Sequence, residues 1–313
     1  MTTLWTNELT ASEWDKHLAN LNGHPLQSAL WGDARAKVDH IPDFRYACLE
    51  DDKPVFMARI ERRTVPTLGN VAWLARGPVC HEKCQAYLHE LQNQIKHHQF
   101  GFMVTDPYAV VNTARQYSTQ TILLDLTIGE EKLLANLHKQ WRYGVRRAEK
   151  EGVNIEIGES NLTDFFELCQ QVSQTKDFEL PGSLELIQFL LANHYNPKAR
   201  FVLICAKFEN KVIAGAVIVQ MGQHAHYFWG ASDRNYANQR GGEAVQWAAI
   251  QWALKNNISQ YDLGGIDPVN NPGTYAFKKK MGGKEVLLQG VEYTTFTLTA
   301  KLGLKAAKIL GKI

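Results

Sequence analysis

Three consecutive lysines, Lys278 to Lys280, lie on the same short stretch of chain as a glycine pair, Gly264 and Gly265. Residues 261–263 read as the end of a buried strand. The glycines therefore predict a loop at its carboxyl end, where a backbone without Cβ can approach another group closely. An ammonium group beside such a loop can stabilise an oxyanion or bind a phosphate. The alternative is a lysine turn that is merely solvated.

A second group of cations is predicted on one helix near the middle of the chain. Lys139, Arg142, Arg146 and Lys150 recur at spacings of three and four residues, which places them on one helical face. That face either meets a polyanion or is an ordinary solvated surface, and the sequence leaves both readings open.

An anion-binding turn is predicted where a strand leads into a helix, at residues 230–242. The pattern Gln239-x-x-Gly242-x-Ala244 resembles the Q/R-x-x-G-x-G/A signature of the GNAT acyltransferases and lies where that family has it. In that family, N–H groups at the start of the helix hold a pyrophosphate, since helix N-termini attract anions. Arg240 lies within the pattern.

No metal site is predicted. Cys80, His81 and Cys84 are close in sequence, but no second pair follows at the spacing of a zinc site. His224 and His226 share one face of a strand and, without a third ligand in a matching pattern, read as strand surface. The five cysteines are odd in number and lie in apolar stretches, which is typical of reduced thiols.

Length and composition predict a two-domain protein of the cytoplasm. The 313 residues suit two domains of about 150 each. A net charge of +2 excludes a general nucleic-acid binder, so any such role must depend on a local patch. The first residues lack the basic and apolar regions of a signal peptide, and no segment approaches the roughly 20 apolar residues of a membrane span.

Hydrophobic periodicity predicts the same order of elements in both halves of the chain. The first half has helices at 12–21, 28–38 and 81–98 and strands at 44–50, 54–63, 70–75, 101–105 and 120–126. A helix from 127 to 152, opened by a capping box at Thr127 and Glu130, begins the second half. Strands follow at 153–157, 201–208, 212–220, 224–230, 259–263 and 285–298, with helices at 162–172, 183–195 and 242–255. This repetition indicates an internal duplication.

Five segments in order resemble the Fem family of peptidoglycan-bridge aminoacyltransferases. They are Gln27-Ser-Ala-Leu-Trp-Gly32, Leu74-Ala-Arg-Gly-Pro-Val79, Asp106-Pro107, Arg146-Arg-Ala-Glu-Lys-Glu-Gly-Val153, and Tyr261-Asp-Leu-Gly-Gly-Ile266 with Phe277-Lys278. The resemblance implies an α+β fold of two tandem GNAT-like domains, 1–145 with a C-terminal helix 299–313, and 146–298. No long heptad run is present, so the coiled-coil arm of some members is not expected.

The resemblance also implies a reaction, the transfer of an amino acid from aminoacyl-tRNA to a stem-peptide amine of a muramyl-pentapeptide precursor. It implies that Lys278, in the Phe277-Lys278 pair, approaches the transferred ester and is the catalytic residue. Arg35 stands where the shorter members place a lysine that contacts the precursor's diphosphate. Lys176 stands where many relatives have an arginine. No cofactor is expected, and the family gives no general base.

The remaining candidate residues belong to two sets. The precursor-binding set adds Gly264, Gly265, Asp267 and Tyr275 to Arg35, Lys176 and Phe277. The residues expected to contact phosphates of tRNA or of coenzyme A are Gln239, Arg240, Gly242, Arg142, Arg146 and Lys279. Two other functions stay open, an acyl-CoA-dependent N-acyltransferase that uses the turn at 239–244 and a non-catalytic binder of tRNA or precursor.

The last predicted helix, 298–313, is basic and amphipathic. Such a helix either lies on the anionic inner face of a membrane or packs on the first domain. The protein is expected to act as a monomer, and membrane contact at the inner face is the additional partner that this helix suggests.

Overall fold

The computed structural model describes residues 3–65, 69–80, 84–176 and 182–309. The chain divides into two compact units. Unit 1 comprises residues 1–118 and 287–313, and unit 2 comprises residues 119–286. These limits differ from the expected 1–145 and 146–298, because the strand and helices after residue 118 pair and pack within unit 2.

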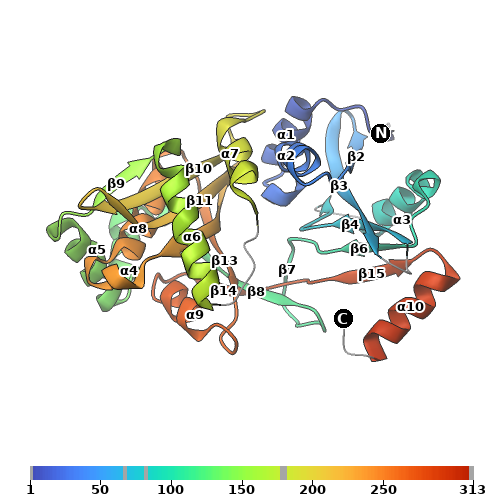
Figure 1. Cartoon of the computed structure of the whole chain (residues 1–313). Coiled ribbons are helices and arrows are strands. Elements are labelled where there is room, and N and C mark those ends of the chain that lie inside the picture. Colours follow the sequence, from blue (N-terminus) through green and yellow to red (C-terminus); the bar gives the residue numbers. More distant parts are fainter. Residues whose placement is uncertain (1–2, 66–68, 81–83, 177–181, 310–313) are drawn as a thin grey trace. The chain divides into compact units, whose positions relative to one another are not determined.

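Unit 1 is one sheet with helices on both faces (Figure 1). Its helices are α1 (Ala11–Asn20), α2 (Ala29–Val38), α3 (Cys84–Gln94) and α10 (Leu298–Ile309). The strands of this sheet are β1 (Thr3–Thr6), β2 (Asp43–Glu50), β3 (Lys53–Val65), β4 (Gly69–Leu74), β5 (Val79–Cys80), β6 (Phe102–Thr105) and β15 (Glu292–Thr295). The short strand β7 (Val110–Val111) also lies in unit 1 but belongs to the second sheet. The expected hairpin is present as β2 and β3, which pair antiparallel.

Unit 2 has its own set of helices. They are α4 (Glu130–Asn136), α5 (Lys139–Lys150), α6 (Leu162–Lys176), α7 (Leu184–Ala192), α8 (Gly241–Lys255) and α9 (Pro272–Lys279). Its strands are β8 (Thr119–Asp125), β9 (Asn154–Ile157), β10 (Ala199–Phe208), β11 (Lys211–Met221), β12 (His224–Ser232), β13 (Gln260–Ile266) and β14 (Lys284–Leu288), of which the last reaches the unit boundary.

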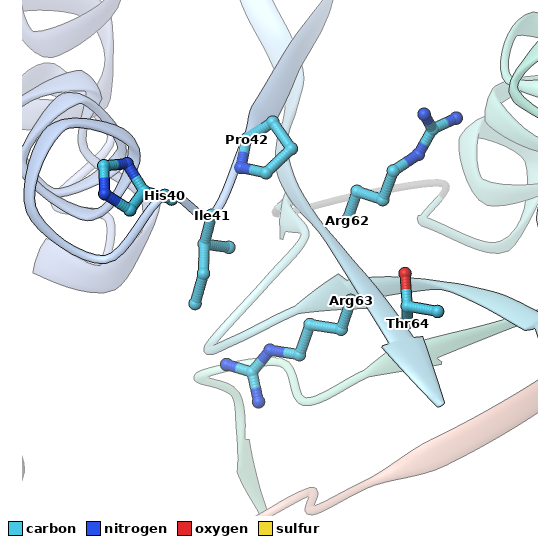
Figure 2. A pocket seen from close by; sticks show the side chains of 6 residues that line it. All are labelled: His40, Ile41, Pro42, Arg62, Arg63 and Thr64. Atoms are coloured by element: carbon cyan, nitrogen blue, oxygen red, sulfur yellow. The ribbon is translucent and has the colours of Figure 1, made fainter. Parts of the chain in front are cut away.

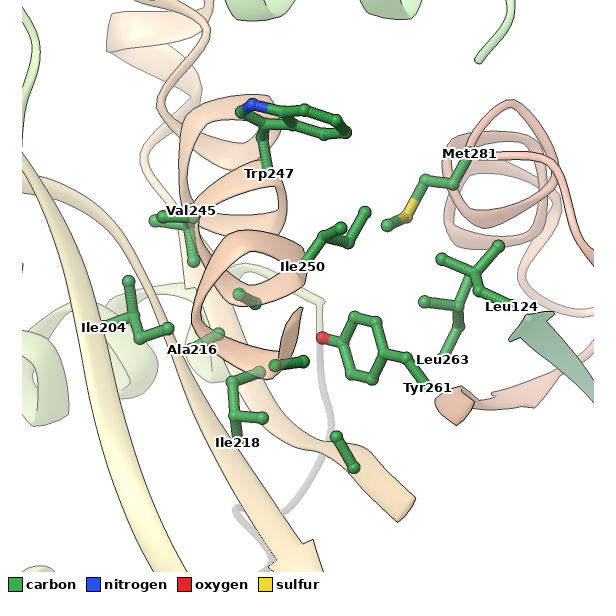
Figure 3. Close-up of a cluster of buried hydrophobic side chains, with 14 of the residues drawn as sticks. Leu124, Ile204, Ala216, Ile218, Val245, Trp247, Ile250, Tyr261, Leu263 and Met281 are labelled. Carbon is green, nitrogen blue, oxygen red and sulfur yellow. The ribbon is translucent and has the colours of Figure 1, made fainter. Parts of the chain in front are cut away.

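Alternation along β11 explains how two helices cover the sheet of unit 2. Ala216 and Ile218 belong to the core cluster that includes Val245 of α8 (Figure 3). Gly215, which points the other way, leaves space for Phe165 of α6, whose ring an added Cβ would approach to 2.5 Å. Because successive strand residues face opposite sides, α8 and α6 lie on opposite faces. Unit 2 is therefore a three-layer arrangement.

The duplication expected from the sequence is confirmed by the strand orders. Sheet one runs β1-β2-β3-β4-β6-β15, and sheet two runs β9-β10-β11-β12-β13-β8 before β14 and β7. In each, the fourth and fifth strands of this order pair in parallel, β4 with β6 and β12 with β13, while their other neighbours are antiparallel. The two units repeat one topology.

The sixth strand of each sheet comes from across the domain boundary expected between residues 145 and 146, because β8 of the second sheet precedes that point and β15 of the first sheet follows it. After β6 and β7 the chain leaves unit 1, and the next strand, β8, pairs with β13 in unit 2. After unit 2 the chain returns, and β15 pairs with β6 in unit 1. The departing and returning segments lie together within unit 1, where Ser118 Oγ donates to the carbonyl of Gln289 at 3.1 Å and Arg115 pairs with Glu292.

Several local predictions are corrected. The expected helix 127–152 is two helices, because α4 ends before Leu137 and His138 caps α5. Thr127 does not open a capping box; its hydroxyl donates to Asp125, and Gly129 precedes α4. Thr10, rather than Ser12, caps α1. The expected strand 285–298 is β14 and β15, separated by a break at 289–291.

Candidate active site

Parallel pairing between β12 and β13 is short, and the site lies where it stops. Their register covers three pairs and ends at His226 opposite Asp262. On its other side, β13 pairs with β8, and that register is interrupted between Asp262 and Gly265. Leu263 and Gly264 thus form a bulge inside β13, directly before Gly265, rather than the loop beyond the strand that the sequence predicted.

Gly264 is required at this bulge by its conformation and its surroundings. Its φ is +73°, a value that L side chains rarely adopt, and an added Cβ would lie 3.0 Å from the carbonyl oxygen of Tyr227. The carbonyl oxygens of Gly264 and of Gly265 both accept hydrogen bonds from Lys278 Nζ.

Lys278 is buried although it belongs to a run of three lysines. It lies on α9, the helix that Asn271 caps, and its side chain is 7% exposed. Its Nζ lies 3.2 Å from the oxygen of Gly264, 2.8 Å from that of Gly265 and 5.5 Å from the centre of the Tyr227 ring. Of the alternatives left by the sequence, the solvated lysine turn is therefore wrong for this residue.

Burial is the main electrostatic influence on Lys278. Removal from water disfavours the ammonium form and lowers its pKa to about 8, while the negative charge of Asp262 opposes the shift. Near neutral pH the side chain is mostly charged, but a modest change of environment would release its proton. A titratable amine in a protected site is a common feature of catalytic centres.

Asp262 is a buried carboxylate that the sequence analysis did not select. Its Oδ1 accepts hydrogen bonds from the Thr121 hydroxyl on β8 and from the Gly264 N–H at 2.8 Å. Its Oδ2 lies 3.6 Å from Nδ1 of His226 on β12. Three neighbouring strands therefore meet at this carboxylate. Its position directly before Leu-Gly-Gly was a signal in the sequence.

The two histidines of β12 are not the strand surface that was expected. His226 is 3% exposed, and burial lowers the pKa of His224 to about 4. Among the residues that the structure describes, no group of three or more His, Cys, Asp or Glu side chains could hold a metal ion. His81 lies outside the described residues, and the thiols of Cys80 and Cys84, which are described, form no disulfide.

The neighbours of Lys278 on α9 have other contacts. Lys279 is exposed and donates to Glu285 and, at 2.9 Å, to the hydroxyl of Tyr275. Lys280 donates to Gln140 on α5 at 3.0 Å. Lys279 and Lys280 therefore donate to side chains, whereas the ammonium of Lys278 donates to two backbone carbonyls.

Phe277 joins α9 to the helices beside it. Its ring lies 5.2 Å from that of Trp141 on α5, and its carbonyl accepts the Trp141 indole N–H at 3.1 Å. An added Cβ at Gly242 would lie 3.7 Å from the Phe277 ring, so the start of α8 is also next to it. Asp267 organises the turn before α9, where it accepts N–H groups of Val269 and Asn270.

The predicted anion site at the start of α8 contains a carboxylate of the chain itself. Arg240 precedes the helix with a φ of +58°, and Gln239 is half-buried beside it. Glu243, in the first turn, lies 3.3 Å from the Arg240 guanidinium. An added Cβ on Gly144 of α5 would lie 2.9 Å from the Glu243 carboxylate. The N-terminus of α8 is thus partly covered by α5 and already faces an anion.

The cationic stripe on α5 is less uniform than its spacing suggests. Arg142 donates to the carbonyls of Ala135 and Leu137 at 2.6 and 2.5 Å, and so closes the end of α4. Arg146, in contrast, is exposed. Arg147, which was not selected, donates to the Asn238 carbonyl at 3.0 Å. Of the two selected arginines, only Arg146 presents its charge to solvent.

Two candidate residues lie apart from this group in the chain. Arg35, on α2 of unit 1, pairs with Asp39 at 2.5 Å and lies 5.9 Å from the Trp31 ring. Lys176 is the last residue of α6, and its side chain lies outside the described residues.

A pocket of about 370 Å³ in unit 1 is lined by six residues, none of which was selected from the sequence: His40, Ile41, Pro42, Arg62, Arg63 and Thr64. Figure 2 shows Arg62 and Arg63 leaving β3 on opposite sides. Arg62 donates to the His98 carbonyl at 2.8 Å, and Arg63 pairs with Glu61 at 2.7 Å. Because these cations have partners within the chain, the pocket is not the candidate active site.

Comparison with known proteins agrees with the fold. Residues 135–279 match the family model described as an acetyltransferase (GNAT) domain. The crystal structure of FemX has a TM-score of 0.82 at 16% identity, with 98% of this chain and 99% of that chain covered. A tandem GNAT protein from the clavulanic acid biosynthesis pathway has a TM-score of 0.53 at 10% identity. That match covers 94% of this chain and 98% of the tandem GNAT protein.

Two curated relatives are similar in sequence over part of their length. A lipid II:glycine glycyltransferase of Staphylococcus saprophyticus is 33% identical over 81 residues, which cover 24% of this chain and 19% of the relative. A UDP-N-acetylmuramoylpentapeptide-lysine N(6)-alanyltransferase of Weissella viridescens is 28% identical over 165 residues, 50% of this chain and 47% of the relative. The chain therefore matches less than half the length of each.

Proposed function

We propose that this chain, a Fem-type protein with two tandem GNAT-like domains, transfers an amino acid from aminoacyl-tRNA to an amine on the stem peptide of a peptidoglycan precursor. The observation that carries the proposal is the ammonium of Lys278, buried at the β13 bulge and held by two carbonyl oxygens. The names of the two curated relatives support the class of acceptor.

The chemistry requires an amine to attack the ester carbonyl of the donor. Negative charge then develops on the carbonyl oxygen, and a fixed cation in a water-poor site stabilises that charge more strongly than water does. Lys278 fits this role because its ammonium is desolvated and positioned before substrate arrives. The backbone carbonyls that hold it are too weakly basic to take its proton, so they position the group and favour its ammonium form.

A tRNA donor is favoured over coenzyme A by the start of α8. The GNAT-like pattern is present, but Glu243 places a carboxylate in the first turn, where a pyrophosphate would need free N–H groups. A second anion there would be repelled. Arg146 on α5 offers an exposed cation to a larger polyanion.

The acceptor is proposed to be a muramyl-pentapeptide precursor, either nucleotide-linked or lipid-linked. We assign Arg35 and Lys176 to its phosphates, and Asp267, Tyr275 and Phe277 to the remainder of the substrate site. Gln239, Arg240, Gly242 and Lys279 are assigned to the donor. Since charged tRNA is a cytoplasmic molecule, the proposed place of action is the cytoplasm, and the protein is proposed to act as a monomer.

Contact with the inner face of the membrane is proposed through α10. Leu298 and Leu302, one turn apart, are 72% and 60% exposed, and Lys301 and Lys305 are exposed beside them. A helix with this composition can lie on an anionic lipid surface. No helix among residues 3–309, apart from the segments left undescribed, has the length and apolar character to cross a bilayer. Sedimentation with anionic vesicles, compared between the wild type and Leu298→Ser/Leu302→Ser, tests the contact.

A transfer assay tests the central proposal. Mixed aminoacyl-tRNA, labelled in the amino acid, is incubated with UDP-linked or lipid-linked precursor, and label in the precursor is measured. Labelled precursor supports the proposal. Thermal shift adds a second readout, because a bound ligand raises the Tm with the logarithm of its excess over Kd. We expect a shift with UDP-muramyl-pentapeptide and none with acetyl-CoA. The reverse result favours the acyl-CoA alternative, and binding without transfer favours a non-catalytic binder.

A further inference from the structure

Lys278 is held by a bulge, and the bulge itself requires an explanation. Gly264 has positive φ, and the β13–β8 register breaks between Asp262 and Gly265. Glycine adopts positive φ as readily as negative φ, so neighbouring groups must select this conformation. The contacts that do so converge on one side chain, Asp262.

We infer that Asp262 is a positioning residue for the proposed transfer reaction, because its carboxylate fixes Gly264 in the bulge, and the carbonyl oxygens of Gly264 and Gly265 hold the Lys278 ammonium. This inference rests on the proposed function of Lys278. It assigns Asp262 no contact with substrate, so Asp262 acts only through the lysine.

The first step is the geometry of the carboxylate. Asp262 is 4% exposed, and its Oδ1 accepts the N–H of Gly264 two residues later. This bond turns the peptide that follows, so that the oxygens of Gly264 and Gly265 both face Lys278 Nζ. The hydroxyl of Thr121 on β8 donates to the same Oδ1 and fixes the carboxylate from the neighbouring strand.

The second step is charge. Around Lys278, the titratable side chains are Asp262 on β13 and, on β12, Tyr227 with His226 and His224 beyond it. Burial raises the pKa of Tyr227 to about 12 and lowers that of His224 to about 4, so both are neutral near pH 7. Asp262 is the group whose charge favours the ammonium form of Lys278. Asp262 therefore both positions the Lys278 ammonium, through the bulge, and stabilises its charged form.

Asp262→Asn separates these contributions. The amide oxygen still accepts from Gly264 and Thr121, but the negative charge is lost. The [ε-13C]lysine signal of Lys278, assigned by its absence in Lys278→Met, is followed against pH. We expect its midpoint to fall by about one pH unit, as for loss of a nearby opposite charge. A midpoint near 7 leaves about a tenth of the ammonium form at pH 8, against about half in the wild type, so we also expect kcat at pH 8 to decrease about fivefold with little change in KM for the precursor.

Thr121→Val and Thr121→Ser test how the position of the Asp262 carboxylate affects the reaction. They also test the inference if the Asp262→Asn protein does not fold. Valine removes one donor to the carboxylate and keeps its charge. We expect a severalfold lower kcat at an unchanged midpoint for Lys278, and recovery of kcat in Thr121→Ser, which restores the hydroxyl.

Asp125→Asn is the matched control. Asp125 also accepts from a backbone N–H and a threonine hydroxyl, those of Thr127, but it is exposed at the far end of β8. The Asp125→Asn substitution should leave both the titration midpoint of Lys278 and kcat unchanged.

Three results overturn the inference: an unchanged Lys278 midpoint in Asp262→Asn, a shifted midpoint with wild-type kcat, or loss of kcat in Thr121→Val that Thr121→Ser does not restore. Failure of the proposed function is distinguishable, because the wild type would then transfer no label to the precursor, and failure of the role of Lys278 alone would leave Lys278→Met with wild-type kcat. The ε-carbon titration still reports on Asp262 in that case.

Discussion

Lys278 differs from Lys279 and Lys280 in what surrounds its ammonium group, and substitution should reveal the difference. Lys278→Met keeps the unbranched stem and removes the charge. If the ammonium acts on charge that develops at the ester, kcat should fall on the order of a hundredfold with little change in KM for the precursor. Lys279→Met and Lys280→Met should have far smaller effects, because those cations contact Glu285 and Gln140. Equal, mild losses in all three variants would assign the run to the electrostatic surface instead.

The lowered pKa of Lys278 predicts how activity depends on pH. Burial lowers it to about 8, so the ammonium form is present below that pH and is lost as pH rises through it. The profile of kcat should therefore have an alkaline limb near pH 8, whereas an ordinary lysine would hold its proton to about pH 10. An alkaline limb that remains in Lys278→Met would belong to another group.

The same shift has a consequence for stability. Between pH 8 and the ordinary lysine value the unfolded chain binds a proton that the folded chain has lost, so the free energy of unfolding should rise with pH in this window. The difference from Lys278→Met should reach about 3 kcal/mol at most, because one pKa unit corresponds to about 1.4 kcal/mol. Urea unfolding of both proteins across the window measures it.

At the scale of elements, α5 shows how much a periodic pattern can predict. Spacing identified a helix with one cationic face, and that face exists. The pattern could not show that α5 begins only at Lys139, after its cap His138, because Leu134 and Leu137 continue the apolar stripe across the break. Nor could it show that Arg142 turns back to close α4. Both outcomes depend on hydrogen bonds at helix ends, which periodicity does not contain.

Arg142 and Arg146 should consequently behave differently in tRNA binding. Arg146→Ala should reduce the slope of log K against log salt by about one, the effect of one lost phosphate contact. Arg142→Ala should mainly lower the Tm, since it leaves the carbonyls of Ala135 and Leu137 without their donor. Filter binding across a salt series provides the slopes, with exposed Lys96→Ala of unit 1 as control. A slope unchanged by Arg146→Ala would remove α5 from the tRNA surface.

At the scale of the whole molecule, the fold was predicted correctly from the sequence, but the residue limits of the two domains were not. The duplicated order of elements, the tandem GNAT-like fold and the Fem-type resemblance are confirmed by the strand orders and by the comparisons. The boundaries differed because local patterns show that residues 120–126 form a strand but not which sheet receives it. Which sheet a strand joins depends on contacts between residues distant in sequence. The burial of Asp262 depends on such contacts too, and for that reason the sequence did not single it out.

The exchange of sixth strands predicts unequal behaviour of the two units when they are separated. A fragment of residues 119–288 contains the strands from β8 to β14 and should unfold cooperatively on its own. A fragment of residues 1–118 lacks β15, so the edge of β6 has no partner. It should aggregate or lack fixed tertiary structure until residues 287–313 are supplied, as near-ultraviolet circular dichroism would show. A stable, monomeric 1–118 fragment would contradict this.

The same exchange determines the sequence of events during synthesis on the ribosome. Domains generally fold in the order in which they emerge, with the N-terminal one first. Here the sheet of unit 1 cannot be completed until β15, at residues 292–295, has been translated. The sheet of unit 2 can form earlier, because its strands lie between the two segments of unit 1. The nascent chain thus carries an open β6 edge through most of its translation, and chaperones that bind exposed strands should associate with it until β15 emerges.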